Sequence, residues 1–380
     1  MDTPLNLLFA RIGIGGVSLR NRLAVAPMTR VSATADGHAT RRMAQYYASF
    51  AEGGFGLVIT EGIYTDRAYS QGYLFQPGLT DASQREAWRP VVAGVHENGA
   101  RIFAQLMHAG ALSQGNVHRS ETRGPSAVRP KGQQMSFYRG SGQYRLPNAM
   151  SQVEIAEAVN GFANAAVLAR EAGFDGVELH GANGYLLDQF LTEGVNLRDD
   201  SYGGTVERRV RLLVETVQAV RRAVGADFIV GVRISQGKVN DFTHKWRGGE
   251  RDAAVIFGTL RGMPIDYVHT TEFEAWCPAF GEGPTLTALA KRHLAIPVMA
   301  NGSLQDPKQA SGLLARGEAD LVSLGRGALT HADWPRRVAR GAPIEAFDPK
   351  LLAPIADLEH ADRHQWKSRE GTLSTPSHRV

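Results

Sequence analysis

The side chains best able to do chemistry in this sequence follow short apolar runs. His180, Asn183 and Tyr185 come at the end of the run that begins at Phe174, and their spacing of i, i+3 and i+5 lets a short turn direct all three to one side. Further candidate residues stand at the ends of other apolar runs: Pro27, Met28, Thr29, Glu61, Gly62, Gln105, His108, Arg233, Asn301, Gly302, Gly325 and Arg326. Hydrogen-bond donors, histidines, a tyrosine and an arginine together suit an organic cofactor with carbonyl and phosphate groups.

Other chemistries lack the residues that they need. His108 and His180 belong to different runs and no convincing metal-binding cluster surrounds them, so we predict no metal site. Neither a Ser/His/Asp arrangement nor a pair of carboxylates suited to glycoside hydrolysis is recognisable. Cys277 is the one cysteine of the chain, which excludes an internal disulfide and an iron–sulfur cluster held by cysteines of this chain alone.

The elements that must position these residues alternate along the chain. Eight apolar runs begin at Asn21, Phe55, Ala100, Phe174, Asp227, Ile265, Ile296 and Ala319. Such runs are typical of parallel strands covered on both faces. The amphipathic stretches between them predict helices over 39–53, 81–98, 151–172, 206–223, 249–261, 306–316 and 330–340. Eight units without a break in composition predict one α/β domain over 1–380, a (β/α)8 TIM barrel, with an open doubly wound sheet as the alternative.

A barrel would gather the candidate residues on one face, because barrel enzymes carry their active sites at the C-terminal ends of the strands. Residues 110–150 follow the third strand and are rich in Gly, Pro, Ser, Gln and Arg. A long segment of this kind is usually functional, so we predict an extended loop insertion over the active site. The excursion 236–248 belongs to the same face, and 350–380 form a polar C-terminal tail whose place the sequence does not indicate.

The last two runs carry a phosphate-binding pattern. MANGSL and SLGRGAL each end in a glycine-containing turn before a helical stretch. The loops after strands seven and eight are a recurrent phosphate site in barrels, because backbone N–H groups at a helix start point toward the anion. Arg326 could add a charge-assisted contact. The alternative is that Gly302 and Gly325 merely allow tight turns.

Composition narrows the class of protein. The net charge is +4, from 42 basic and 38 acidic residues, and no long basic run points to nucleic acid. No apolar run reaches the roughly 18 residues that a membrane span needs, and the N-terminus lacks the layout of a signal peptide. We therefore expect a soluble, cytoplasmic protein that binds no nucleic acid and no membrane.

Several segments together resemble the Old Yellow Enzyme family of NAD(P)H:flavin oxidoreductases. NRLAVAPMTR, ITEGIYTD, AQLMHAG, VELHGANGYLLDQFL, NLRDDSYGGTVERRVR, VGVRIS and ANGSL…GRGAL stand in the family's order and spacing over roughly residues 5–345. HGANGYLLDQFL followed by the R-D-x-Y-G-G stretch is the most specific part. The resemblance implies FMN lying across the top of the barrel and NADPH or NADH as its reductant.

The resemblance also implies roles for the candidate residues. The backbone of Pro27 and Met28 would face the flavin, Thr29 would form a hydrogen bond to its O4/N5 side, and Gly62 would lie against the ring. Gln105 would hold the pyrimidine edge, and Arg233 would lie near N1 and O2. The phosphate would be held by Asn301, Gly302, Gly325 and Arg326. His180 and Asn183 would bind the carbonyl or nitro oxygen of a substrate. Tyr185 would donate the proton. Some members of the family carry a cysteine at the position of Thr29. Because this chain has threonine there, a redox-sensing variant is not expected.

The implied activity is an ene-reductase. Nicotinamide reduces the flavin, and hydride then passes from flavin N5 to the activated C=C bond of an α,β-unsaturated carbonyl compound or similar small, electron-poor alkene. Two alternatives remain open at this stage: an FMN-dependent dehydrogenase or demethylase of small amines, and a non-catalytic flavin-binding redox sensor. The physiological substrate, the choice between NADH and NADPH and the oligomeric state are not readable from the sequence.

Overall fold

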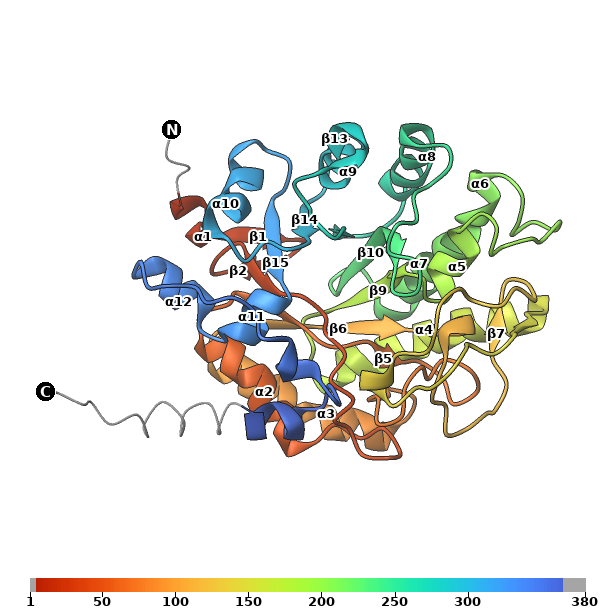
Figure 1. Ribbon diagram of the computed structural model, residues 1–380, viewed down its shortest axis with the longest axis horizontal. Helices are drawn as coiled ribbons and strands as arrows, with labels where there is room; N and C mark the ends of the chain where they lie inside the picture. Colours follow the sequence, from red (N-terminus) through yellow and green to blue (C-terminus); the bar gives the residue numbers. More distant parts are fainter. Residues whose placement is uncertain (1–4, 365–380) are drawn as a thin grey trace, which may run out of the picture.

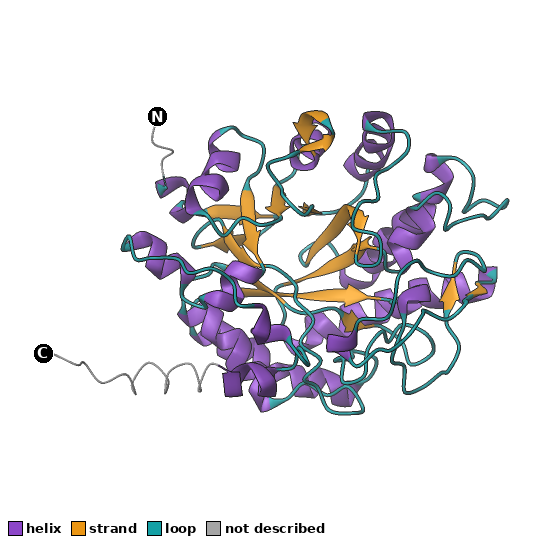
Figure 2. Ribbon diagram, in the orientation of Figure 1, coloured by secondary structure: helices purple, strands orange, loops and turns teal. Residues whose placement is uncertain are grey.

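The computed structural model describes residues 5–364, and its centre is a closed parallel barrel. The barrel strands are β3 (Leu23–Val25), β4 (Leu57–Ile59), β6 (Arg101–Met107), β9 (Gly176–Asn183), β10 (Ile229–Lys238), β11 (Tyr267–Thr271), β14 (Val298–Asn301) and β15 (Leu321–Leu324). Each pairs in parallel with the next, and β15 pairs with β3, which closes the ring. The predicted (β/α)8 architecture is confirmed, and the strands lie inside a ring of helices (Figure 1, Figure 2).

The ring consists of α2 (Arg41–Glu52), α3 (Ala82–Glu97), α4 (Gln152–Ala172), α7 (Arg211–Val224), α8 (Glu250–Arg261), α9 (Leu286–His293), α10 (Pro307–Ala315) and α12 (Trp334–Ala339). The expected capping box begins α4: Ser151 Oγ accepts from the Glu154 N–H, and Glu154 Oε2 accepts from the Ser151 N–H. The helix predicted over 206–223 is instead two helices, α6 (Val206–Arg209) and α7, and the range 330–340 holds the end of α11 (Arg326–Thr330) and α12.

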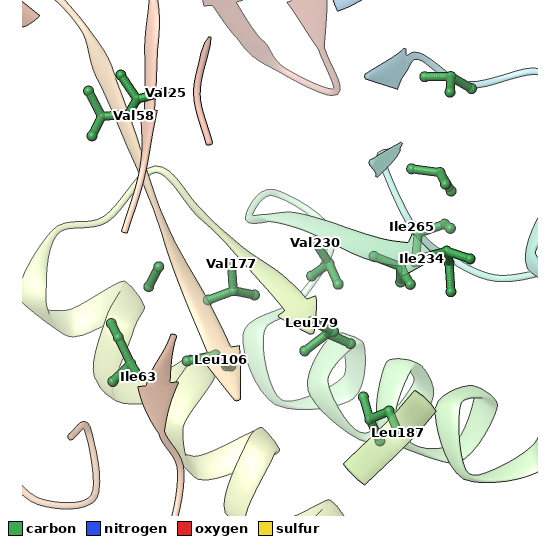
Figure 3. Packing of buried hydrophobic residues seen from close by; sticks show 14 of the residues in the cluster. Val25, Val58, Ile63, Leu106, Val177, Leu179, Leu187, Val230, Ile234 and Ile265 are labelled. Atoms are coloured by element: carbon green, nitrogen blue, oxygen red, sulfur yellow. The ribbon is translucent and has the colours of Figure 1, made fainter. Parts of the chain in front are cut away.

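Alternation along the strands separates two cores. Outward-facing residues such as Val177, Leu179 and Val230 pack against the helices in the main apolar cluster (Figure 3). Inward-facing residues near the strand starts, among them Phe103 and Tyr267, form a second cluster with a hairpin of β1 (Ile12–Ile14) and β2 (Val17–Leu19). The hairpin closes this end of the barrel, so the open end is the one where the strands finish.

The C-terminal end of the barrel carries the longest connections. Between β6 and α4 the structure has only the short elements η1 (Gly110–Leu112), β7 (Arg123–Gly124), η2 (Ser136–Tyr138) and β8 (Asn148–Ala149). β10 runs on to Lys238, three residues into the predicted excursion 236–248. Other short elements are α1 (Asn6–Phe9), β5 (Ile63–Tyr64), α5 (Leu186–Leu191), β12 (Pro278–Phe280), β13 (Glu282–Thr285) and η3 (Pro349–Leu352).

The predicted tail 350–380 is described only as far as residue 364, and residues 365–380 lie outside the described part. Within residues 5–364, no helix combines the length and the apolar character required to cross a bilayer.

Candidate active site

A cavity of about 410 Å³ lies where the barrel strands end. All of the predicted site residues except Gly62 line it: Pro27, Met28, Thr29, Gln105, His180, Asn183, Tyr185, Arg233, Asn301, Gly302, Gly325 and Arg326. Met135, Phe137 and Tyr138 of the segment after β6 line it too, as does Leu352 of η3. Residues from the ends of seven barrel strands and from two distant segments therefore share one space.

Gly62 lies outside this lining. A Cβ built on Gly62 would be 2.6 Å from Sδ of Met107, and Met107 itself lines the cavity. The close approach of Met107 gives the glycine a packing reason, and its contact with a flavin stays a prediction. His108 likewise lines no part of this cavity, and its Nδ1 accepts a bond from the Gly110 N–H at 3.1 Å.

The end of β9 turns sharply, which brings His180, Asn183 and Tyr185 to the cavity. Asn183 has a φ of 61° and Gly184 one of 86°, and these are the residue types that tolerate left-handed backbone most readily. The Asn183 N–H donates to Ser235 Oγ at 2.8 Å, which fixes the turn against β10. Tyr185 then begins α5 as its N-cap residue.

His180 is a neutral hydrogen-bonding group. It is 3% exposed, and burial, reinforced by the positive charge of Arg233, lowers the pKa of its imidazole to about 3. Its Nδ1 is buried and finds no hydrogen-bond partner among residues 5–364. A buried polar atom without a partner is costly, so the ring is prepared for a bond to a ligand.

Tyr185 belongs to a group of buried tyrosines. Its hydroxyl lies 2.5 Å from that of Tyr73, and the ring of Tyr73 packs at 4.8 Å from that of Tyr138. The Tyr138 hydroxyl donates to the Thr29 carbonyl at 3.3 Å, which connects the group to the loop after β3. Burial raises the pKa of Tyr185 well above its usual value near 10, so the hydroxyl keeps its proton and can donate it.

A buried polar network lies under Gln105 and Arg233. Glu178 accepts bonds from Gln105 Nε2 at 2.9 Å, Tyr267 Oη at 3.0 Å and His269 Nδ1 at 2.8 Å. The sequence interpretation overlooked this network. The signal that could have revealed it is the alternation of side chains along the strand GVELH. Glu178 stands two residues before His180, so both side chains face the same side, the barrel interior.

The predicted phosphate residues stand at the ends of β14 and β15 and line the same cavity. The carboxamide of Asn301 is already bonded, since Oδ1 accepts from Arg233 Nη2 at 2.9 Å and Nδ2 donates to the Ser323 carbonyl at 3.0 Å. Its side chain therefore orients Arg233. Gly302 is required by its neighbour, because a Cβ there would be 2.3 Å from the Glu272 carbonyl oxygen, whereas a Cβ on Gly325 would have its nearest contact at 3.7 Å.

Arg326 begins α11 at the mouth of the cavity. Its Nη2 donates to Ser303 Oγ at 2.7 Å, and its guanidinium lies 5.6 Å from the centre of the Phe273 ring. These contacts hold a cation beside the glycine-containing turns of β14 and β15.

The arrangement fits an elongated organic cofactor. Buried nitrogens without hydrogen-bond partners among residues 5–364, His180 Nδ1 and Arg233 Nε, belong to one part of the lining, and glycine turns with Arg326 belong to another. Carbonyl groups suit the first region and a phosphate suits the second. Among residues 5–364 no group of three or more His, Cys, Asp or Glu side chains is arranged to hold a metal ion.

Comparison with known proteins identifies relatives of this chain. A family model described as the NADH:flavin oxidoreductase / NADH oxidase family matches residues 7–345. A probable flavin mononucleotide-dependent alkene reductase of Leishmania infantum is 35% identical over 367 residues, which cover 94% of this chain and 97% of the relative. An NADH oxidase of Thermoanaerobacter brockii is 31% identical over 349 residues, and this chain spans about half of that relative's length, 51%.

Solved structures have the same fold. An old yellow enzyme homologue from Zymomonas mobilis superimposes with a TM-score of 0.84 at 31% identity, over 93% of this chain and 98% of that one. Morphinone reductase in complex with tetrahydroNAD gives a TM-score of 0.82 at 30% identity, over 93% and 96%. The chain therefore belongs to the NADH:flavin oxidoreductase / NADH oxidase family of FMN-dependent oxidoreductases, the Old Yellow Enzyme family that its sequence resembles.

Proposed function

We propose that the protein reduces the activated C=C bond of α,β-unsaturated carbonyl compounds or similar small, electron-poor alkenes, with NADPH or NADH as the reductant. The observation that carries the proposal is the meeting of a neutral histidine, an asparagine and a protonated tyrosine in one cavity. Two relatives support it by name, the alkene reductase of Leishmania infantum and the morphinone reductase solved with a nicotinamide analogue.

The chain's residues would hold FMN in the cavity as follows. Gln105 and Arg233 would face its pyrimidine edge, the loop of Pro27, Met28 and Thr29 with Gly62 would face its ring system, and Asn301, Gly302, Gly325 and Arg326 would surround its phosphate. Arg233 would stabilise negative charge that collects on the pyrimidine upon reduction. The bound FMN supplies hydride chemistry that no side chain of the protein can supply.

On the substrate side, His180 and Asn183 would donate hydrogen bonds to the carbonyl or nitro oxygen. Negative charge grows on that oxygen as the β carbon receives hydride, so donors fixed in a buried site stabilise the transition state more than the ground state. Tyr185 would protonate the α carbon. Its hydroxyl is fixed for this by the 2.5 Å contact with Tyr73.

The test separates the two half-reactions. Without oxygen, NADPH or NADH should bleach the yellow protein, and an enone such as cyclohexenone should restore the colour. Tyr185→Phe should slow the second step by about a hundredfold or more, the usual range for general acid catalysis, and leave the first nearly unchanged. Tyr144→Phe is a matched control, because Tyr144 is a buried tyrosine of the same apolar cluster that does not line the cavity.

Two results would contradict the proposal. Equal slowing of both half-reactions in Tyr185→Phe would remove the proton-donor role. Bleaching by a small amine but not by either nicotinamide would replace the ene-reductase with an amine dehydrogenase.

A further inference from the structure

We propose that Glu178 is a positioning residue for the pyrimidine end of FMN: it fixes the orientation of Gln105 and offsets the charge of Arg233 from beneath the cofactor. The inference rests on the proposed function only in that Gln105 and Arg233 face the cofactor. Glu178 does not itself line the cavity, so it would act on the cofactor through Gln105 and Arg233.

Glu178 occupies a layer between the bottom core and the cavity floor. Its side chain is fully buried, and it lies inside the barrel because its neighbours Val177 and Leu179 belong to the outer apolar cluster. An isolated carboxylate in such a place would be strongly unfavourable, yet Glu178 has donors from three other residues, Gln105, Tyr267 and His269.

The network leaves one full negative charge on Glu178. Burial by itself raises the pKa of this carboxyl, but His269, Arg233 and Gln105 together lower it to about 2. His269 stays neutral, because burial lowers the pKa of its imidazole. The neutral ring donates through Nδ1 to Glu178 and accepts through Nε2 from Ser323 Oγ at 2.8 Å. Arg233, a permanent cation, also lowers the pKa of the Glu178 carboxyl through its charge, so it balances the carboxylate together with the hydrogen bond from His269.

A glycine on the next strand makes room for the network. A Cβ on Gly231 would lie 2.0–2.6 Å from three atoms of the Tyr267 ring. No side chain could occupy that position while the ring points toward Glu178. Position 231 of β10 must therefore be glycine for the Tyr267 ring to reach Glu178.

The first consequence concerns Gln105. An ionised carboxylate can only accept hydrogen bonds, so the amide of Gln105 must turn its NH₂ group to Glu178. Its Oε1 is the atom left for the cavity, where it can accept from a ring N–H but cannot donate. Glutamine at position 178 could donate or accept, and would lose this control over the amide of Gln105.

The second consequence concerns charge. Arg233 is 4% exposed, and its Nε has no hydrogen-bond partner within residues 5–364. An uncompensated buried guanidinium would strongly favour the reduced cofactor, which carries more negative charge. Glu178 lowers that field, so it holds the reduction potential of the bound flavin below the value that Arg233 alone would give.

The experiment measures the midpoint potential of the bound flavin in the holoenzyme. Glu178→Gln removes the charge at almost constant shape. We expect the equilibrium between oxidised and reduced flavin to shift at least tenfold toward the reduced form, which raises the midpoint potential by about 30 mV for a two-electron couple. Tyr267→Phe keeps the charge and removes a donor dipole aimed at it, so we expect a smaller change of opposite sign. Glu61→Gln is the control when all variants are compared above about pH 8, because the buried Glu61 carboxyl, whose pKa is about 7, is then also ionised and bonds neither Gln105 nor Arg233.

The outcomes separate clearly. An unchanged potential in Glu178→Gln with FMN bound would overturn the inference, as would a rise of the same size in Glu61→Gln. If Glu178→Gln does not retain FMN, Tyr267→Phe decides: a lowered potential supports the inference, and an unchanged or raised one overturns it. No alkene is needed for these measurements, so a failure of the wild-type protein to reduce enones would end the proposed function without touching this result.

Discussion

Two buried glutamates of the barrel show how local donors decide the charge of a side chain. Glu178 has a hydrogen bond from His269 and the nearby positive charge of Arg233, which lower the pKa of its carboxyl, and it stays ionised. Glu61 accepts from the N–H groups of Arg30 and Val31 at 2.9 and 3.1 Å, but the guanidinium of Arg30 bonds instead to the carbonyls of Ala356 and Asp357. Burial therefore dominates and raises the pKa of the Glu61 carboxyl to about 7.

This difference predicts how stability depends on pH. The folded protein holds the Glu61 proton more tightly than the unfolded chain, so the protonated carboxyl favours folding below the unfolded pKa near 4.5, and this contribution is lost as pH rises through about 7. The shift corresponds to about 3 kcal/mol. Urea unfolding from pH 4 to pH 8, at fixed FMN, should show wild type losing about that much relative to Glu61→Gln. Parallel stability curves for the two proteins would contradict the assignment.

At the scale of elements, the segment after η3 connects two loops above the cavity. The Leu358 N–H donates to Ser32 Oγ at 2.8 Å, the Ala356 N–H donates to the Phe137 carbonyl at 2.9 Å, and Arg139 pairs with Asp357 at 2.7 Å. These contacts join the loop after β3 to the segment after β6, which contributes Phe137 to the cavity wall. The C-terminal segment thus holds part of that wall in place.

Breaking one contact should loosen both segments together. Asp357→Asn removes the partly buried pair with Arg139, worth about 1 kcal/mol or less, so we expect amide hydrogen exchange to rise several-fold over 135–145 and 350–360 with little change in global stability. Asp362→Asn is the control, since it breaks the exposed pair of Arg42 with Asp362 in the same C-terminal segment. Equal protection of residues 135–145 in both variants would show that the segment does not hold the loop.

The elements were predictable where the signal was local. The capping box at Ser151 and the run before His180 identified α4 and β9, because both depend on neighbours in the sequence. The helix α9 was not predicted, since its eight residues give the periodicity little length. The contact of Tyr73 with Tyr185 joins residues 112 apart in the sequence. The Glu178 network, which reaches Ser323 through His269, joins the four strands β6, β9, β11 and β15, so neither contact leaves a local pattern.

At the scale of the whole molecule, the site and the barrel depend on each other. The cavity is lined from the ends of β3, β6, β9, β10, β11, β14 and β15, so a cofactor bound there contacts most of the ring. A ligand that binds only the folded state stabilises it by an amount set by its concentration relative to Kd, about 4 kcal/mol at a thousandfold excess. FMN should therefore raise the melting temperature of the whole protein rather than stiffen one loop.

The phosphate site can be tested through this linkage. Riboflavin lacks the phosphate, so FMN should raise the melting temperature of the wild-type apoprotein more than riboflavin does at equal concentration. Arg326→Ala removes the cation beside the turns of Gly302 and Gly325 and should cost FMN about 1.5–3 kcal/mol of binding, which closes most of the gap between the two ligands. Arg316→Ala removes an exposed arginine paired with Glu318 and is the control, because it should leave the difference in melting temperature between FMN and riboflavin unchanged. If Arg326→Ala keeps it as well, the phosphate is held by other groups, and the predicted role of Arg326 is wrong.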